Sequence, residues 1–222
     1  MAQNDERAQR LKQIADQVAA CRLCRLYEKT TNPVPGSGDP NAEIVFVGEG
    51  PGEQEDLQGL PFVGRSGQYL DYLLSLIGMK RSQVFIANVV KHRPPGNRDP
   101  QPDEILACQP YLDTQLQILD PLLIVTLGRF SMARYFPNAK ISSIHGTPRY
   151  EERIAYYPLY HPAAALRNPG LRQDMEDDIN RIPALLAEVR KLRSGAVTLE
   201  VEESASALPP EDDSPLRQLS LF

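Results

Sequence analysis

Residues 44–56 read Ile-Val-Phe-Val-Gly-Glu-Gly-Pro-Gly-Glu-Gln-Glu-Asp in this sequence of 222 residues. The first four form a continuous apolar run, which is typical of a strand buried on both faces of a parallel sheet. The run leads directly into a loop with three glycines, Gly48, Gly50 and Gly52, where the backbone can approach a ligand closely. Strand and loop together favour an α/β protein with a ligand site at this point of the chain.

The glycine loop allows three interpretations. A phosphate cradle normally contains a lysine or a helix N-terminus without nearby acids, whereas here Glu53, Glu55 and Asp56 follow and would repel a pyrophosphate. A purely structural turn is the second possibility. The third, which we favour, is a loop that holds a neutral, flat group against the backbone while carboxylates position water.

The rest of the chain alternates between helix and strand patterns. Apolar spacing predicts helices over residues 5–19, 66–77 with Ser66 as N-cap, 103–119 and 171–192, and a short helix after Gly128. Apolar runs predict strands over 84–87 and 122–127 and a strand–turn–strand unit over 144–159. This alternation predicts a three-layer α/β/α sandwich around a central, mainly parallel, four-stranded sheet. Since ligands bind at the carboxyl ends of such strands, the glycine loop, Asn88 and His161 should converge.

Charge and composition divide the chain into two parts. Residues 195–222 hold six acids and one base, which accounts for the whole net charge of −5. We therefore expect a neutral domain over residues 1–194 and a disordered acidic tail over 195–222. The sequence has no run of about 20 apolar residues that could span a bilayer, and its polar first ten residues lack a signal-peptide pattern. We expect a cytoplasmic monomer.

The three cysteines favour a metal site over disulfides. Cys21 and Cys24 form a C-x-x-C pair that follows a helix, whereas a thioredoxin-like redox pair would follow a strand. Cys108 lies far downstream, and His92 is the best candidate for a fourth ligand. Spacing alone leaves a zinc site and a [4Fe–4S] cluster about equally plausible.

Over residues 18–190 the chain resembles the family 4 uracil-DNA glycosylases. The motifs that carry the resemblance are Gly48-Glu49-Gly50-Pro51-Gly52 with Glu55-Asp56, Gly59-Leu-Pro-Phe62-Val-Gly64, Asn88-Val-Val-Lys91, Arg93-Pro-Pro, and His161-Pro-Ala-Ala-Ala-Leu166-Arg167. The resemblance implies a uracil-DNA glycosylase-like fold, removal of uracil from DNA as the first step of base excision repair, and a [4Fe–4S] cluster held by Cys21, Cys24, His92 and Cys108.

The sequence departs from the family pattern at two positions. His92 stands where the family usually has a cluster cysteine, as it also does in a branch of the superfamily that crosslinks itself to uracil-DNA. That branch has an inserted basic loop with a nucleophilic histidine, which is absent between His92 and Cys108, so we expect ordinary turnover. Family 1 enzymes have a catalytic Asp in the corresponding glycine loop, and here that position is Gly50.

The resemblance also assigns roles to individual residues. Phe62 would stack on a flipped uracil, Asn88 would read its O4 and N3–H, and Glu55 and the Gly50 backbone would exclude a methyl group on ring carbon 5. His161 would donate a hydrogen bond to O2 of the leaving base. Glu49, with Glu55 as second choice, would position water or stabilise the sugar cation. The candidate DNA contacts are Arg65, Ser66, Lys91, Arg98, Leu166 as a wedge, and Arg167.

Two other functions share these features: a non-catalytic DNA-lesion sensor with an iron–sulfur cluster, and a glycosylase for deaminated purines. The last five residues, Gln218, Leu219, Ser220, Leu221 and Phe222, resemble the pentapeptide with which bacterial repair proteins bind the replicative sliding clamp. The alternative is that this apolar end folds back on the domain.

Overall fold

The computed structural model describes residues 2–195, so the tail residues 196–222 lie outside the described part of the chain. A central sheet has the strand order β1-β3-β2-β4-β6-β5. The strands are β1 (Ser37–Gly38), β2 (Ile44–Gly48), β3 (Phe85–Asn88), β4 (Leu123–Leu127), β5 (Arg149–Glu151) and β6 (Ile154–Leu159). The four inner strands are parallel, and β1 and β5 pair antiparallel at the two edges. The predicted parallel core of four strands is confirmed; β5 and β6 lie within the predicted strand–turn–strand unit, and β1 was not predicted.

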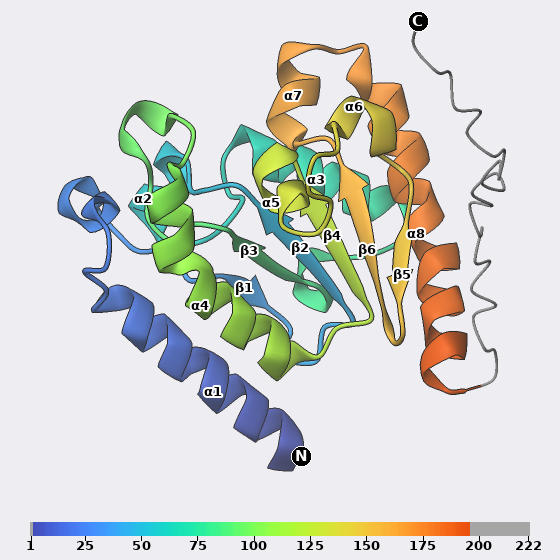
Figure 1. Cartoon of the computed structure of the whole chain (residues 1–222), viewed down its shortest axis with the longest axis horizontal. Helices are drawn as coiled ribbons and strands as arrows, with labels where there is room; N and C mark the ends of the chain where they lie inside the picture. The colour runs from blue at the N-terminus through green and yellow to red at the C-terminus, as the bar shows by residue number, and fades with distance from the viewer. Residues whose placement is uncertain (1, 196–222) are drawn as a thin grey trace, which may run out of the picture.

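Helices cover both faces of the sheet (Figure 1). They are α1 (Ala2–Ala19), α2 (Glu53–Gln58), α3 (Arg65–Leu76), α4 (Pro102–Leu119), α5 (Arg129–Ala133), α6 (Ile141–Ile144), α7 (Pro162–Arg167) and α8 (Leu171–Arg193), with short 3₁₀ turns at Arg25–Lys29, Arg81–Gln83 and Pro95–Asn97. One apolar core joins α3 and α8 to one face of the sheet. A second core joins α4 to the other face, and α1 packs on the outside of α4. The three-layer arrangement is therefore confirmed.

Around the glycine loop, one helix was not predicted and one N-cap was predicted wrongly. The acidic run after the loop forms helix α2, where its carboxylates lie near a helix N-terminus that favours negative charge. Helix α3 begins at Arg65 with Gly64 as its N-cap, so Ser66 lies inside the helix and caps nothing. A glycine in extended conformation replaces the expected hydroxyl cap.

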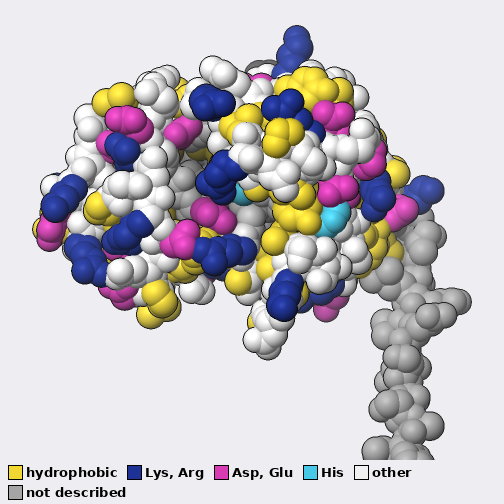
Figure 2. Space-filling view, turned by 90° about the horizontal axis from the view of Figure 1, so that it is seen from above, with side chains coloured by type: hydrophobic (Ala, Val, Ile, Leu, Met, Phe, Trp, Pro, Cys, Tyr) yellow, Lys and Arg dark blue, Asp and Glu magenta, His cyan; other side chains and the backbone are white. Residues whose placement is uncertain are grey.

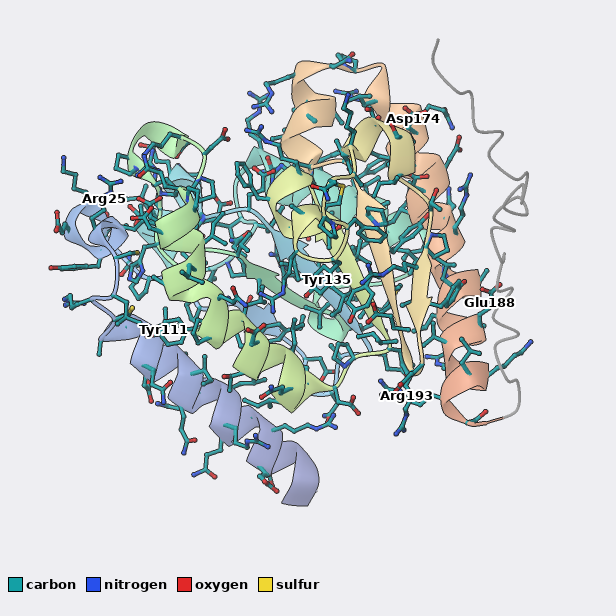
Figure 3. All side chains as sticks on the ribbon, viewed as in Figure 1. Arg25, Tyr111, Tyr135, Asp174, Glu188 and Arg193 are labelled. Atoms are coloured by element: carbon teal, nitrogen blue, oxygen red, sulfur yellow. The ribbon has the colours of Figure 1, made fainter. Side chains whose placement is uncertain are left out.

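The C-terminal end of α8 is hydrogen-bonded to the loops at the amino ends of β4 and β6, away from the glycine loop. Arg193, labelled in Figure 3, donates hydrogen bonds to the carbonyls of Asp120, Pro121 and Arg153. These contacts hold the connections that enter β4 and β6 and leave the carboxyl ends of the strands open. Among residues 2–195, no helix has the length and apolar character required to cross a membrane.

Candidate active site

A cavity of about 570 Å³ opens at the carboxyl ends of the inner strands. Figure 2 looks down on this end of the molecule and shows a hollow with acidic and basic side chains around its rim. The predicted residues in its wall are Glu49, Gly50, Glu55, Phe62, Ser66, Asn88, Arg98, His161 and Arg167. Three segments far apart in the sequence thus meet where the strand pattern predicted.

Asn88, the last residue of β3, points a free amide into this cavity. Its side chain is 1% exposed, and neither Nδ2 nor Oδ1 has a hydrogen-bond partner. A buried amide without partners is costly, about 1–3 kcal/mol for each unsatisfied group. A Cβ atom on Gly48 would lie 2.4 Å from Asn88 Oδ1, so glycine in the loop makes room for this amide. The arrangement offers one donor and one acceptor side by side to a ligand.

Phe62 forms an adjacent wall and is held in an unusual conformation. Its φ is 53°, in the left-handed region that a bulky residue rarely occupies. The Arg81 guanidinium donates to the Phe62 carbonyl at 2.7 Å and to the Pro61 carbonyl at 2.5 Å. The Phe62 ring lies 5.6 Å from the His161 ring, centroid to centroid. The surrounding structure thus imposes the position of an aromatic face in the cavity.

Glu55 has a structural role that was not predicted. Its carboxylate accepts main-chain N–H groups from Gly52 at 3.1 Å, Val63 at 2.8 Å and Gly64 at 2.7 Å. These bonds join the glycine loop to the segment that carries Phe62. Both oxygens of Glu55 are thus committed to holding the loop, whereas burial raises the pKa of Glu49, so Glu49 remains the first choice for activating water.

Glu49 lies in the cavity wall next to the start of α5. Its carboxylate accepts the main-chain N–H groups of Phe130 and Arg129, while burial raises its pKa and so makes it a stronger base. Gly128, with a φ of 92°, makes this approach possible, because a Cβ there would lie 2.5 Å from Glu49 Oε1 and 3.1 Å from His161 Cβ. Glu49 and His161 therefore approach Gly128 from two sides.

His161 is the N-cap of α7, and its tautomer follows from a hydrogen bond. Its Nδ1 accepts the N–H of Ala163 at 3.1 Å, so the neutral ring carries its proton on Nε2. Burial, together with the charge of Arg167, lowers the pKa of His161 to about 4. The residue is therefore a neutral hydrogen-bond donor at ordinary pH.

Gly50 cannot be replaced by the aspartate of family 1 without rearrangement. A Cβ at this position would lie 2.8 Å from Val90 Cγ2 and 3.5 Å from Pro94 Cδ. The space for a side chain is already filled by the segment that follows β3. The packing of this loop therefore explains why residue 50 carries no carboxylate.

The predicted DNA contacts divide into two groups. Arg65 is exposed, Leu166 is partly exposed, and Ser66 and Arg167 line the cavity, so all four are accessible. Lys91 was predicted wrongly: its side chain is completely buried. Its pKa is lowered to about 7 by that burial.

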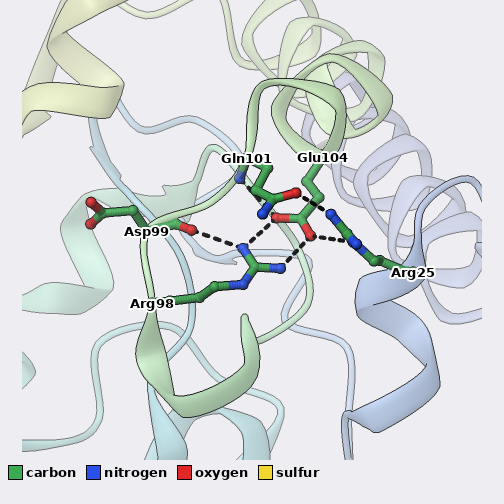
Figure 4. A network of polar contacts seen from close by, with 5 residues as sticks. All are labelled: Arg25, Arg98, Asp99, Gln101 and Glu104. Atoms are coloured by element: carbon green, nitrogen blue, oxygen red, sulfur yellow. Dashed lines mark hydrogen bonds and ion pairs between the residues drawn. The ribbon is translucent and has the colours of Figure 1, made fainter.

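Arg98 lines the cavity, but its guanidinium is already paired. It binds both carboxylate oxygens of Glu104, at 2.9 and 2.6 Å, and Arg25 approaches the same carboxylate from the other side (Figure 4). Glu104 is fully buried, and the hydrogen bonds from Arg98 lower its pKa to about 2. The predicted phosphate contact of Arg98 would compete with this ion pair.

The three cysteines are free thiols, and Cys21 and Cys24 lie close enough to Cys108 to influence its pKa. Burial raises the pKa of Cys108 to about 11, with smaller contributions from Cys24 and Cys21, while the Lys91 N–H donates to its thiol. His92 is 3% exposed, and burial and the charge of Arg22, inside the C-x-x-C pair, lower its pKa.

The predicted ligands fit a metal cluster in chemical type. The three thiols lie near one another, and His92 follows Lys91, whose N–H binds Cys108, while burial favours the neutral imidazole that ligation requires. Within residues 2–195, however, no three His, Cys, Asp or Glu side chains are grouped closely enough to form a metal site as they stand. The donor set is suitable, whereas its side chains are not arranged as ligands.

Several cavity residues were not predicted as site residues. Among them are Asn97, Asp99, Gly128, Arg129 and Tyr160. Arg129 forms an ion pair with Asp99 between α5 and the loop before α4. Gly128 and Arg129 follow β4 directly, so the rule that pointed to the ends of β2 and β3 would also have found them.

Comparison with known proteins agrees with this geometry. A family model described as the uracil DNA glycosylase superfamily matches residues 35–186. The type-4 uracil-DNA glycosylase of Sulfurisphaera tokodaii is 49% identical over 185 residues, which cover 79% of this chain and 84% of that protein. Those of Archaeoglobus fulgidus and Thermotoga maritima are 44% and 40% identical, over 79% and 78% of this chain and 92% and 93% of their own lengths.

Proposed function

Since this chain belongs to the uracil DNA glycosylase superfamily and, within it, to the type-4 enzymes, we propose that it hydrolyses the N-glycosidic bond of uracil in DNA. The products are free uracil and an abasic site, with which base excision repair begins. The observation that carries the proposal is the buried Asn88 amide, whose donor and acceptor both lack partners at the cavity wall.

The amide matches one edge of uracil. A base stacked in a duplex is out of reach, so the nucleotide is flipped into the cavity, where Phe62 offers a face for stacking. The Asn88 NH₂ then donates to O4 and its carbonyl accepts N3–H. Cytosine presents the opposite pattern, and a fixed amide rejects it, since such a mismatch leaves buried polar groups unpaired.

Bond cleavage places positive charge on the sugar and negative charge on the leaving base. The neutral His161 donates its Nε2–H to O2 of the uracil anion, an electrostatic contribution of about 3–4 kcal/mol in comparable sites. The Glu49 carboxyl group, whose pKa is raised by burial, stabilises the sugar cation and orients the attacking water when it is deprotonated. Each group faces the charge that develops.

A substrate panel tests the proposal. A labelled oligonucleotide with one uracil is incubated with the protein and then with alkali, which breaks the strand at an abasic site. Strand scission should occur with uracil and be absent with cytosine or thymine. No scission at any protein concentration would favour a lesion sensor, and scission only with hypoxanthine or xanthine would indicate a purine-specific glycosylase.

We further propose a [4Fe–4S] cluster held by Cys21, Cys24, His92 and Cys108. The support is the proximity of the three thiols and the similarity to type-4 enzymes. Zinc was the alternative that spacing allowed. The cluster would be structural: it would join the segment after α1 to α4, while hydrolysis itself requires no electron transfer.

Purified protein should be brown and contain about four iron atoms per chain. His92→Cys should keep the colour, because a fourth thiolate is an equivalent ligand, whereas Cys108→Ala should lose both colour and thermal stability. Iron and zinc analysis with visible absorption spectra would measure this. Colourless protein with stoichiometric zinc would contradict the cluster.

The proposed clamp-binding segment of the acidic tail lies outside the described residues. Gln218–Phe222 would fill a shallow apolar pocket of a replicative sliding clamp, with the acidic stretch as tether. We also propose that the protein is a monomer in the cytoplasm. Its proposed DNA contacts are Arg65, Ser66, Leu166 and Arg167.

Deleting residues 218–222 should abolish capture by the purified clamp and leave excision from a short oligonucleotide unchanged, because the described residues that line the cavity all precede residue 195. Pull-down and single-turnover assays would measure the two effects. A truncated protein that melts at a lower temperature, from a parent that never binds the clamp, would instead support an apolar end folded on the domain.

A further inference from the structure

Lys91 is a lysine in the core of the molecule. Its side chain is 0% exposed, one of the largest among the fully buried ones. Its Nζ donates to the main-chain carbonyl of Asn88 at 3.0 Å and to Oε1 of Gln115 at 2.7 Å. Both acceptors are neutral, so the burial of this amine is not explained by an ion pair with them. A buried polar group kept at such cost suggests a task beyond stability.

The carbonyl that Lys91 binds belongs to the residue that reads the base. Neither side-chain atom of Asn88 has a partner, so the direction of its amide depends on the backbone of residue 88 and on the neighbouring walls. The following N–H groups, of Val89 and Val90, bind the carbonyls of Gly48 and Glu49 at 3.0 and 3.2 Å. The Lys91 amine binds the main-chain carbonyl of Asn88 and so holds this turn as well.

The same lysine is anchored by two other parts of the chain. Gln115 lies on α4, and its Nε2 donates to the Pro35 carbonyl at 2.7 Å. The Lys91 carbonyl accepts the N–H of Val34 at 2.7 Å, and its N–H donates to the Cys108 thiol. The Asn88 turn is thereby joined to α4 and to the segment that precedes the sheet.

We propose that Lys91 is a positioning residue for uracil recognition: its amine holds the Asn88 main-chain carbonyl and thereby aims the side-chain amide at the base. The inference rests on the proposed uracil site. Lys91 contacts neither base nor DNA, so it acts only through Asn88. Gln115 accepts a hydrogen bond from the amine and so holds it in place.

The variant Lys91→Met keeps the length of the side chain and removes the donor. We expect the inhibition constant of free uracil to rise about tenfold, equivalent to about 1.4 kcal/mol, the size of one hydrogen bond. The matched control is Leu112→Ala, a fully buried residue of the same helix as Gln115 that packs in the core. It should lower the unfolding temperature without changing the affinity for uracil. All constants are measured below the lowest melting temperature.

An unchanged inhibition constant in folded Lys91→Met would overturn the proposal. If that variant does not fold, Gln115→Met decides, because it leaves the lysine with a single acceptor. An increase of about threefold in the inhibition constant is then expected, the size of a weak hydrogen bond, and a wild-type value would reject the idea. Release of uracil by the wild-type protein is measured in parallel, so that failure of the proposed function is recognised separately.

Discussion

Asn88→Leu should lower kcat/KM for uracil excision by about 10⁴-fold, because leucine has a similar volume but cannot pair with O4 or N3–H of the base. The same change should leave the protein as stable as before or more stable, since the amide it removes is buried with both polar atoms unpaired. Single-turnover excision rates and thermal unfolding measure the two effects. Loss of activity with a gain in stability is the signature of a residue kept for recognition.

Thr126→Val is a matched control for this experiment. Thr126 is also fully buried with an unpaired side-chain oxygen, but it lies within β4 and does not line the cavity. Like Asn88→Leu, Thr126→Val should leave the unfolding temperature unchanged or raise it, but it should not change the excision rate. Excision by Asn88→Leu within tenfold of the wild-type rate would show that the amide does not read the base.

The features that could be predicted from sequence are those with a periodic or positional signal. Strands β2 and β4 are buried on both faces, so they read as apolar runs, with Thr126 the one polar residue in β4, and the long helices show their apolar spacing. Given parallel strands, the end of each strand falls at one edge of the sheet. That rule alone brought Asn88 and His161 to the glycine loop.

The features that could not be predicted depend on partners distant in sequence. Lys91 follows a strand in a basic segment, which reads as surface, and its burial depends on Gln115, 24 residues later. The acidic run showed Glu55 as a carboxylate but not the Val63 and Gly64 amides that occupy it. Strand β1 has only two residues, too few for any pattern.

His161→Ala should lower the rate of excision by about 10²–10³-fold, the usual loss when one donor to a developing oxyanion is removed. In the wild-type protein the pKa of His161 is lowered to about 4, so the ring is neutral between pH 5.5 and 8 and its Nε2–H donor is present throughout. His161 should therefore contribute no titration to the pH–rate profile in that range. Only as the pH falls through about 4 does the ring gain its charge. Single-turnover rates over this range measure both effects.

His145→Ala is the matched control, because His145 pairs with Asp178 through a 2.7 Å contact outside the cavity wall. Its loss should lower the unfolding temperature, since Asp178 is 3% exposed and would lose a hydrogen-bond partner, while the excision rate stays near that of the wild type. A rate step near pH 6.5 that disappears in His161→Ala would show that a charged imidazole, titrating at its ordinary pKa, assists departure of the base. A flat profile together with the large loss in His161→Ala leaves the neutral ring as the donor, because a group that stays uncharged contributes through its hydrogen bond alone.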